Sequence, residues 1–207
     1  MKYFEVLMLT VKARTVFSAL ARLEVALKES VTGTHLLGCW TSELGPQNQI
    51  AILRGFDSLD TRQSERERLL LDSNGLDVSD VLLNWEFNDY TIFPFLKPLE
   101  PGTHGPLYEF REYSLVGTGL APTLKGWQKA VAPRTTDQYS QVYAALYATS
   151  GSAPRYLHIW PYQTLEQRLD VRSRTVADGV WPPENAGPQL QLMKSTLFLP
   201  ASFSPLK

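Results

Sequence analysis

The stretch Gly55-Phe56-Asp57-Ser58-Leu59-Asp60-Thr61-Arg62 recurs later in the chain as Pro161-Tyr162-Gln163-Thr164-Leu165-Glu166-Gln167-Arg168, with Phe56 matching Tyr162. Nearer the start, Phe4-Glu5 recurs as Tyr108-Glu109. These landmarks keep their order and nearly their spacing, which indicates a duplicated folding unit. We therefore divide the 207-residue chain into repeat 1 (residues 1–100) and repeat 2 (residues 101–207), with a linker rich in proline and glycine at 98–106.

Hydrophobic periodicity predicts the same order of elements in both repeats: strand, helix, strand, strand, helix, strand. In repeat 1 we expect a strand at 3–11, a helix from 16 to 27, strands at 36–43 and 49–56, a helix through 62–68 capped by Ser58, further helix over 78–83, and a strand at 90–95. In repeat 2 we expect a strand at 107–115, a helix at 120–132, strands at 141–148 and 155–160, a helix that Thr164 and Gln167 cap as a capping box, and a strand at 193–199.

This order is ferredoxin-like, and such a unit places both helices on one face of a four-stranded antiparallel sheet. The strand at 3–11 carries apolar side chains on both faces, so the face without helices also needs a cover. The simplest cover is the sister repeat. We therefore predict an α+β fold in which two ferredoxin-like repeats pack sheet to sheet as a pseudo-dimeric α+β barrel.

The composition narrows the classes of function. A net charge of −1 gives no electrostatic reason to expect nucleic acid as a partner. No apolar run is long enough to cross a bilayer, so we expect no membrane partner. The single cysteine, Cys39, cannot form an internal disulfide and fits a reducing compartment. A soluble, cytoplasmic protein is the expectation.

Residues 38–68 resemble the NIPSNAP family. They hold Gly-Cys-Trp-Thr-Ser-Glu-Leu-Gly-Pro-Gln-Asn-Gln (38–49), and then the helix start Gly-Phe-Asp-Ser-Leu-Asp-Thr-Arg (55–62). Repeat 2 keeps that helix start and a family-like tail, although its turn differs and Leu146 stands where repeat 1 has Trp40. The resemblance implies a dimeric α+β barrel that forms a homo-oligomer. Related barrel families include cofactor-independent oxygenases, isomerases and heme-degrading enzymes that use a cavity between sheet and helices. The resemblance carries no catalytic residue to this chain.

Two arginines stand out because Arg62 and Arg168 occupy the first turn of their helices, where a cation opposes the helix dipole. Glu5 and Glu109, which also recur, are the carboxylates we expect to pair with them. A structural ion pair that joins helix to sheet is the favoured interpretation. A clamp for a ligand is the alternative.

Five residues are candidates for a ligand pocket: Trp40, Asn48, Tyr143, Tyr147 and His158. Asn48 lies in the Gly-Pro turn and Trp40 in the strand before it, although Asn in such a turn more often bonds its own backbone. His158 alternates with aromatic residues, so they share one face of their strand. We expect Tyr143 and Tyr147 on the neighbouring strand to do the same. An aromatic cavity with one imidazole would suit an enzyme or a binding protein. Aromatic residues that alternate along a strand, however, more often belong to the hydrophobic core.

No pair of histidines or cysteines has metal-ligand spacing, and no nucleotide loop or serine nucleophile motif occurs. We therefore predict no metal site and no cofactor. Two functions stay open. The favoured one is a self-associating NIPSNAP-like module of unassigned activity. The alternative is a small-molecule-binding protein, or a cofactor-independent oxygenase or isomerase, that uses a cavity between sheet and helices.

Overall fold

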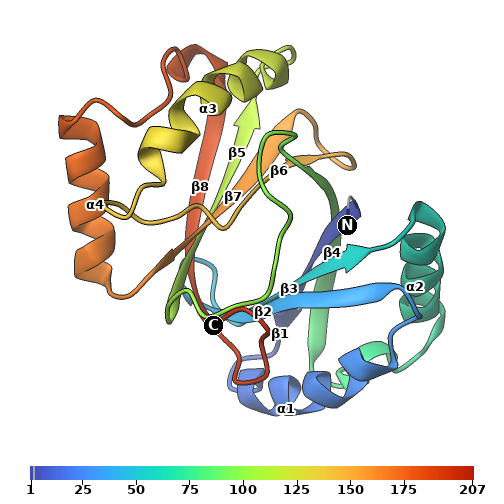
Figure 1. Ribbon diagram of the computed structural model, residues 1–207. Helices are drawn as coiled ribbons and strands as arrows, with labels where there is room; N and C mark the ends of the chain where they lie inside the picture. The colour runs from blue at the N-terminus through green and yellow to red at the C-terminus, as the bar shows by residue number, and fades with distance from the viewer. Residues whose placement is uncertain (2) are drawn as a thin grey trace.

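The chain runs twice through the order strand–helix–strand–strand–helix–strand, and the two halves build one closed barrel (Figure 1). The computed structural model describes residue 1 and residues 3–207. The first half contains β1 (Tyr3–Val11), α1 (Val16–Ala26), β2 (Thr34–Leu44), β3 (Gln49–Phe56), α2 (Leu59–Leu71) and β4 (Leu82–Ile92). The second half contains β5 (Leu107–Leu115), α3 (Leu120–Arg134), β6 (Ala144–Ala148), β7 (Arg155–Tyr162), α4 (Leu165–Ala177) and β8 (Leu190–Pro200). Short 3-10 turns, η1 to η3, lie at Leu27–Glu29, Gly75–Asp77 and Gly187–Gln189.

The barrel consists of two sheets that join along both edges. The first half has the strand order β4-β1-β3-β2 and the second half has the matching order β8-β5-β7-β6. Antiparallel pairing of β2 with β8 and of β4 with β6 closes the ring. Figure 1 shows α1 and α2 on one side of the barrel and α3 and α4 on the opposite side. The predicted pseudo-dimeric α+β barrel is confirmed, and the two sheets are also hydrogen-bonded to each other.

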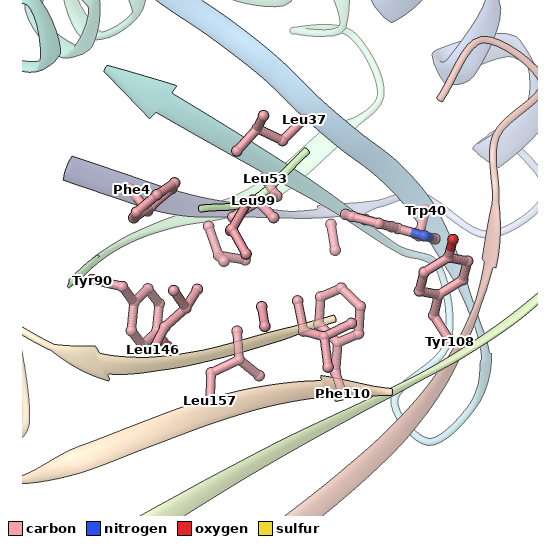
Figure 2. Packing of buried hydrophobic residues seen from close by; sticks show 14 of the residues in the cluster. Phe4, Leu37, Trp40, Leu53, Tyr90, Leu99, Tyr108, Phe110, Leu146 and Leu157 are labelled. Carbon is pink, nitrogen blue, oxygen red and sulfur yellow. The ribbon is translucent and has the colours of Figure 1, made fainter. Parts of the chain in front are cut away.

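Three hydrophobic clusters follow from this arrangement. One fills the barrel interior, where Trp40 packs on Tyr108 and Phe110 with ring centroids 5.4 and 5.2 Å apart (Figure 2). A second lies between the first-half sheet and its helices, and a third lies between the second-half sheet and its helices. The alternation of β-strand side chains explains this, because each strand sends one set of residues inward and the other toward its helices.

The two halves have the same strand register, which gives each residue of one half a counterpart in the other. Leu7 of β1 lies opposite Ile52 of β3, and Arg111 of β5 lies opposite His158 of β7. Leu7 therefore corresponds to Arg111, and Ile52 corresponds to His158. The same register matches Leu9 with Tyr113, and Ile50 with Tyr156.

The helix predicted over 78–83 is wrong. Leu76 and Asp77 adopt φ values of 63° and 55°, a left-handed conformation that stops a helix. The chain then enters β4, which occupies Leu82–Ile92 rather than the predicted 90–95. The other predicted strands begin and end within three residues of the observed ones.

Both predicted helix caps form. The Ser58 hydroxyl accepts a hydrogen bond from the backbone N–H of Thr61 at 3.0 Å, and the Thr164 hydroxyl accepts one from Gln167 at 3.1 Å. The Gln167 side chain accepts from the backbone N–H of Gln163 at 2.6 Å, one residue earlier than in a standard capping box. These caps hold the start of α2 and α4, from which the charged side chains described below project.

Candidate functional site

A cavity of about 340 Å³ lies between the second-half sheet and its helices. Arg111 and Tyr113 of β5, Tyr156 of β7, Arg134 of α3 and Arg172 of α4 line it. The other lining residues belong to the end of α4, to the segment that follows it and to β8: Thr175, Val176, Trp181, Pro182, Pro183, Ala186, Gly187, Leu190 and Met193. The position matches the predicted location of a cavity between sheet and helices.

In the first half, aliphatic side chains occupy the corresponding positions of the sheet. Leu7, Leu9, Ile50 and Ile52, the counterparts of Arg111, Tyr113, Tyr156 and His158, are all fully buried. They pack together in the first-half cluster with residues from α1 and α2. The two halves thus share a backbone plan, but only the second replaces this aliphatic core with arginine, tyrosine and histidine.

Glu109 of β5 anchors the polar wall of the cavity. Its carboxylate accepts hydrogen bonds from Arg168 at 2.7 Å, from Ser195 at 2.6 Å and from Arg172 at 3.3 Å. The Arg111 guanidinium lies 3.9 Å away. Burial raises the pKa of Glu109, but the hydrogen bonds from Arg168 and Ser195 and the nearby guanidinium charges outweigh burial, so the pKa is lowered. Glu109 is therefore an anion at neutral pH.

Arg134 lies at the other end of the polar wall and is only 3% exposed. It donates hydrogen bonds to the backbone carbonyl of Ser140 at 2.9 Å and stacks on the Trp160 ring at 4.2 Å. Burial is the main cause that lowers its pKa. Among the residues that the structure describes, no carboxylate pairs with Arg134, and its Nε atom has no hydrogen-bond partner.

His158 lies directly behind the cavity and is fully buried. Its Nδ1 atom accepts a hydrogen bond from the Trp160 indole at 2.6 Å, while its Nε2 atom has no partner among the described residues. Tyr113 and Tyr156, which line the cavity, have ring centroids 4.9 and 5.3 Å from the imidazole. Burial first, and the charges of nearby arginines second, lower the pKa of His158 well below its usual value. The imidazole is therefore neutral.

The predicted pairing of Arg168 with Glu109 is present, but the predicted pairing of Arg62 with Glu5 is wrong. In the described part of the chain, Glu5 binds Arg54 of β3 at 2.5 Å and Arg66, which lies one turn beyond Arg62. Arg62 instead lies 3.6 Å from Asp89. The buried Arg54 holds Glu5 from the sheet side, and Arg66 is the residue of α2 that reaches it.

The structure separates the five predicted pocket residues: none of them lines this cavity, His158 contacts two tyrosines that do, and Tyr143 lines a different cavity of about 650 Å³. Trp40 is fully buried inside the barrel. Asn48 takes a left-handed turn conformation with φ of 57°, and its backbone carbonyl accepts from Val11. Tyr143 packs against the barrel interior and donates to a backbone carbonyl at 3.3 Å, so it does not share the face of His158. Tyr147 does lie on the helix-facing side, with its ring 6.5 Å from that of Phe93.

Sequence reasoning misses the three arginines that line the cavity. Arg111 was detectable, because the repeat alignment matches it with Leu7 of the first half, a change from apolar to charged at a position that faces the helices. Trp181 carried a weaker signal as part of a Trp-Pro-Pro segment that repeat 1 lacks. Arg134 and Arg172 have no such sequence signal, since charged residues on helices are usually solvated.

A second cavity, of about 440 Å³, opens at one mouth of the barrel. Charged residues of both signs line it, including Glu112, Arg155 and Lys194. Arg155 is already satisfied by the carbonyls of Ser150 and Ser152 and by the side chain of Asn88. The Arg155 guanidinium in this second cavity is therefore already hydrogen-bonded within the protein.

Neither a metal centre nor a membrane span is found in the part of the chain that the structure describes. No group of three or more His, Cys, Asp or Glu side chains there could hold a metal ion. No helix there is both long enough and apolar enough to cross a membrane.

Each half of the chain matches the same protein-family model. A family model described as NIPSNAP matches residues 4–81 and residues 108–205. The chain belongs to the NIPSNAP family. This NIPSNAP chain is 25% identical over 150 residues to the Protein NipSnap homolog of Dictyostelium discoideum, an alignment that covers 72% of this chain and 66% of that relative. The predicted family resemblance is confirmed, and the matched region spans about two thirds of the relative's length.

Solved structures share the whole barrel with this NIPSNAP chain. A proposed monooxygenase from Lactobacillus acidophilus NCFM superposes with a TM-score of 0.71 and 9% identity, covering 97% of this chain and 94% of that one. An anthrone oxidase-like protein gives a TM-score of 0.69 and 9% identity, covering 97% and 92% respectively. At such low identity the likeness concerns the fold alone.

Proposed function

We propose that this NIPSNAP chain binds a small molecule in the cavity between the second-half sheet and α3 and α4. The observation that carries the proposal is the difference between the halves. At four matched positions the first half has buried aliphatic residues, while the second half has Arg111, Tyr113, Tyr156 and His158 around or behind a cavity. A volume of about 340 Å³ lies in the range of small-molecule sites. Buried polar groups without partners reduce stability, so a purely structural core would not favour this exchange.

Two fluorescent dyes test this proposal. N-phenyl-1-naphthylamine and its sulfonated analogue 1-anilinonaphthalene-8-sulfonate both brighten in apolar sites. We expect Ala186→Phe, which places a ring in the cavity wall, to weaken binding of at least one dye about tenfold. Leu71→Phe, at a site on α2 that is 85% exposed, is the matched control. If Ala186→Phe left the binding of both dyes unchanged, the cavity would not be the site.

A second candidate function is self-association through α4. Leu165, Leu169 and Val176 lie at helical spacing along one face of α4 and are 44%, 61% and 61% exposed. Exposed apolar stripes of this kind occur at protein interfaces. Native mass spectrometry counts the subunits: we expect a homo-oligomer that Leu169→Glu dissociates. A monomeric wild-type protein would contradict this candidate.

Two further proposals concern organisation and location. We propose that residues 1–100 and 101–207 are the two fused units of an ancestral homodimer. The matched strand orders of the two halves support this division. We also propose a cytoplasmic location, supported by the single free cysteine.

A further inference from the structure

We propose that the ligand of the second-half cavity is an organic anion with a flat apolar body. This inference rests on the proposed binding function and adds the chemical class of the ligand. Three guanidinium groups line the cavity, from Arg111, Arg134 and Arg172. Aromatic rings lie among these arginines: Tyr113 and Tyr156 are at a centroid distance of 5.4 Å, and the Arg111 guanidinium lies 5.2 Å from the centre of the Tyr113 ring.

The charge balance of the second half calls for an anion. Arg111, Arg168 and Arg172 all share one carboxylate, that of Glu109. Arg134 has no carboxylate partner in the described part of the chain. A buried cation without a counter-charge is unfavourable, so the site gains most from a ligand that supplies the missing negative charge.

The first half shows what a balanced cluster of the same design looks like. There Arg54 bridges two carboxylates, those of Glu5 and Glu65. Arg66 also binds two carboxylates, those of Glu5 and Asp89. The first-half cluster thus holds three carboxylates, from Glu5, Glu65 and Asp89, whereas the arginines of the second-half cluster share the single carboxylate of Glu109.

The charged cluster of the second half leaves polar atoms without partners. In the described residues, the buried Nε atoms of Arg111, Arg134 and Arg168 and the buried Oε2 atom of Glu109 have no hydrogen-bond partner, and the same holds for the Nε atoms of Arg54 and Arg62 in the first half. Guanidinium groups bind carboxylate and sulfonate oxygens through paired hydrogen bonds, which an amide or a hydroxyl matches less well. A cationic ligand would be repelled by the arginines, and a neutral one would leave their charge uncompensated.

The other residues that line the cavity suit an aromatic ring of the ligand. Trp181, Leu190 and Met193 line the cavity beside the two tyrosines, so the ligand body meets flat or apolar surfaces. Aromatic faces favour stacked or edge-on rings. The anionic group is therefore expected next to the guanidinium groups, with the ring against the faces of Tyr113, Tyr156 or Trp181.

The two dyes used above differ only in the sulfonate group, so they test this inference directly. We expect the full-length protein to bind the sulfonate dye at least tenfold more tightly than the neutral dye. Arg172→Met should weaken the sulfonate dye about tenfold, in line with the loss of a hydrogen bond to a charged group, and leave the neutral dye nearly unchanged. Arg174→Met is the matched control, because Arg172 and Arg174 are both on α4, both 40% exposed, and equal in charge.

The outcomes separate the two proposals. A sulfonate preference that Arg172→Met removes and Arg174→Met retains supports the anionic ligand. Equal binding of both dyes, weakened by Ala186→Phe, overturns the anionic class but keeps the binding site. If neither Ala186→Phe nor Arg172→Met changes either dye, both proposals fail. Near-ultraviolet circular dichroism of each variant shows that the folded state is retained.

Discussion

Substituting Arg54 by Met is expected to destabilise the protein strongly, because Arg54 is the centre of the balanced charge cluster in the first half. Its guanidinium is 1% exposed and donates to Glu5 at 2.5 Å and to Glu65 at 2.9 Å, both fully buried. Met has a similar length but no charge. The substitution therefore leaves two buried carboxylates that each lose one cationic partner.

The structure allows a rough magnitude for this loss. Removing one member of a buried ion pair costs about 3–5 kcal/mol. In the variant, Glu5 still pairs with Arg66, and Glu65 still pairs with Arg68 at 2.9 Å. We therefore expect a loss of stability at the lower end of this range. For a chain of this size, about 3 kcal/mol lowers the melting temperature by roughly 6–12 °C. Urea unfolding and a thermal scan at pH 7 would measure both quantities.

Arg68→Met is the matched control for this prediction. Arg68 also donates to Glu65, but its side chain is 29% exposed, so its loss is expected to cost about 1 kcal/mol or less. A free energy of unfolding for Arg54→Met within 1 kcal/mol of the wild-type value would refute the reasoning. It would mean that Arg66 and Arg68 alone satisfy the two carboxylates.

The pH dependence gives a second readout of the same cluster. Burial raises the pKa of Glu65, but the hydrogen bonds from Arg68 and Val31 and the charge of Arg54 outweigh it, so the pKa is lowered. A lowered carboxyl pKa contributes stability above the unfolded value of about 4.5, and that stability is lost as the pH falls through the folded value. The difference between wild type and Arg54→Met should therefore be largest near pH 7 and shrink below about pH 4.5.

Three further substitutions test the packing, a helix cap and the buried imidazole. Gly38→Ala would place a Cβ atom 2.0 Å from the Trp40 ring, so we expect a loss of about 2–3 kcal/mol that nearly vanishes in a Trp40→Leu background, measured by a double-mutant cycle. Ser58→Ala removes the cap of α2 and should lower the free energy of unfolding by about 1 kcal/mol in urea titrations. Burial lowers the pKa of His158, so below about pH 6.5 the imidazole binds a proton in the unfolded chain but not in the folded one, and the free energy of unfolding falls. His158→Gln should flatten this fall between pH 7 and 5.

The fold was predictable from sequence where each strand has apolar residues on both faces. β1 has its predicted bounds for this reason, and β3 and β5 also have theirs, although β5 carries Glu109 and Arg111 on its helix-facing side. β4 was misplaced because its inward residues Glu86 and Asn88 line the polar mouth of the barrel and interrupt the apolar alternation. A strand whose inner face meets solvent at one end gives no clear periodic signal.

The ion pairs show a different limit of sequence reasoning. The pairing of Arg168 with Glu109 follows from the repeat, but Glu5 binds Arg66 instead of Arg62. Both arginines lie on α2 one turn apart, and helical spacing alone does not decide which one reaches the sheet. Which arginine of α2 binds Glu5 depends on a residue of another strand. Arg54 of β3 already binds the Glu5 carboxylate from the sheet side.

The location of the cavity follows from the difference between the inner surface of the barrel and the outer surface that faces the helices. Side chains inside the barrel contact both halves, so an exchange there disturbs the whole molecule. Side chains that face the helices contact one half only and can change without that consequence. Four matched pairs inside the barrel agree with this argument, since both members of each pair are apolar and buried: Phe4 and Tyr108, Val6 and Phe110, Ala51 and Leu157, and Leu53 and Ile159. The four exchanges from aliphatic to polar or aromatic residues all lie on the helix-facing surface of the second half, which is where a duplicated barrel can acquire a binding site without losing its core.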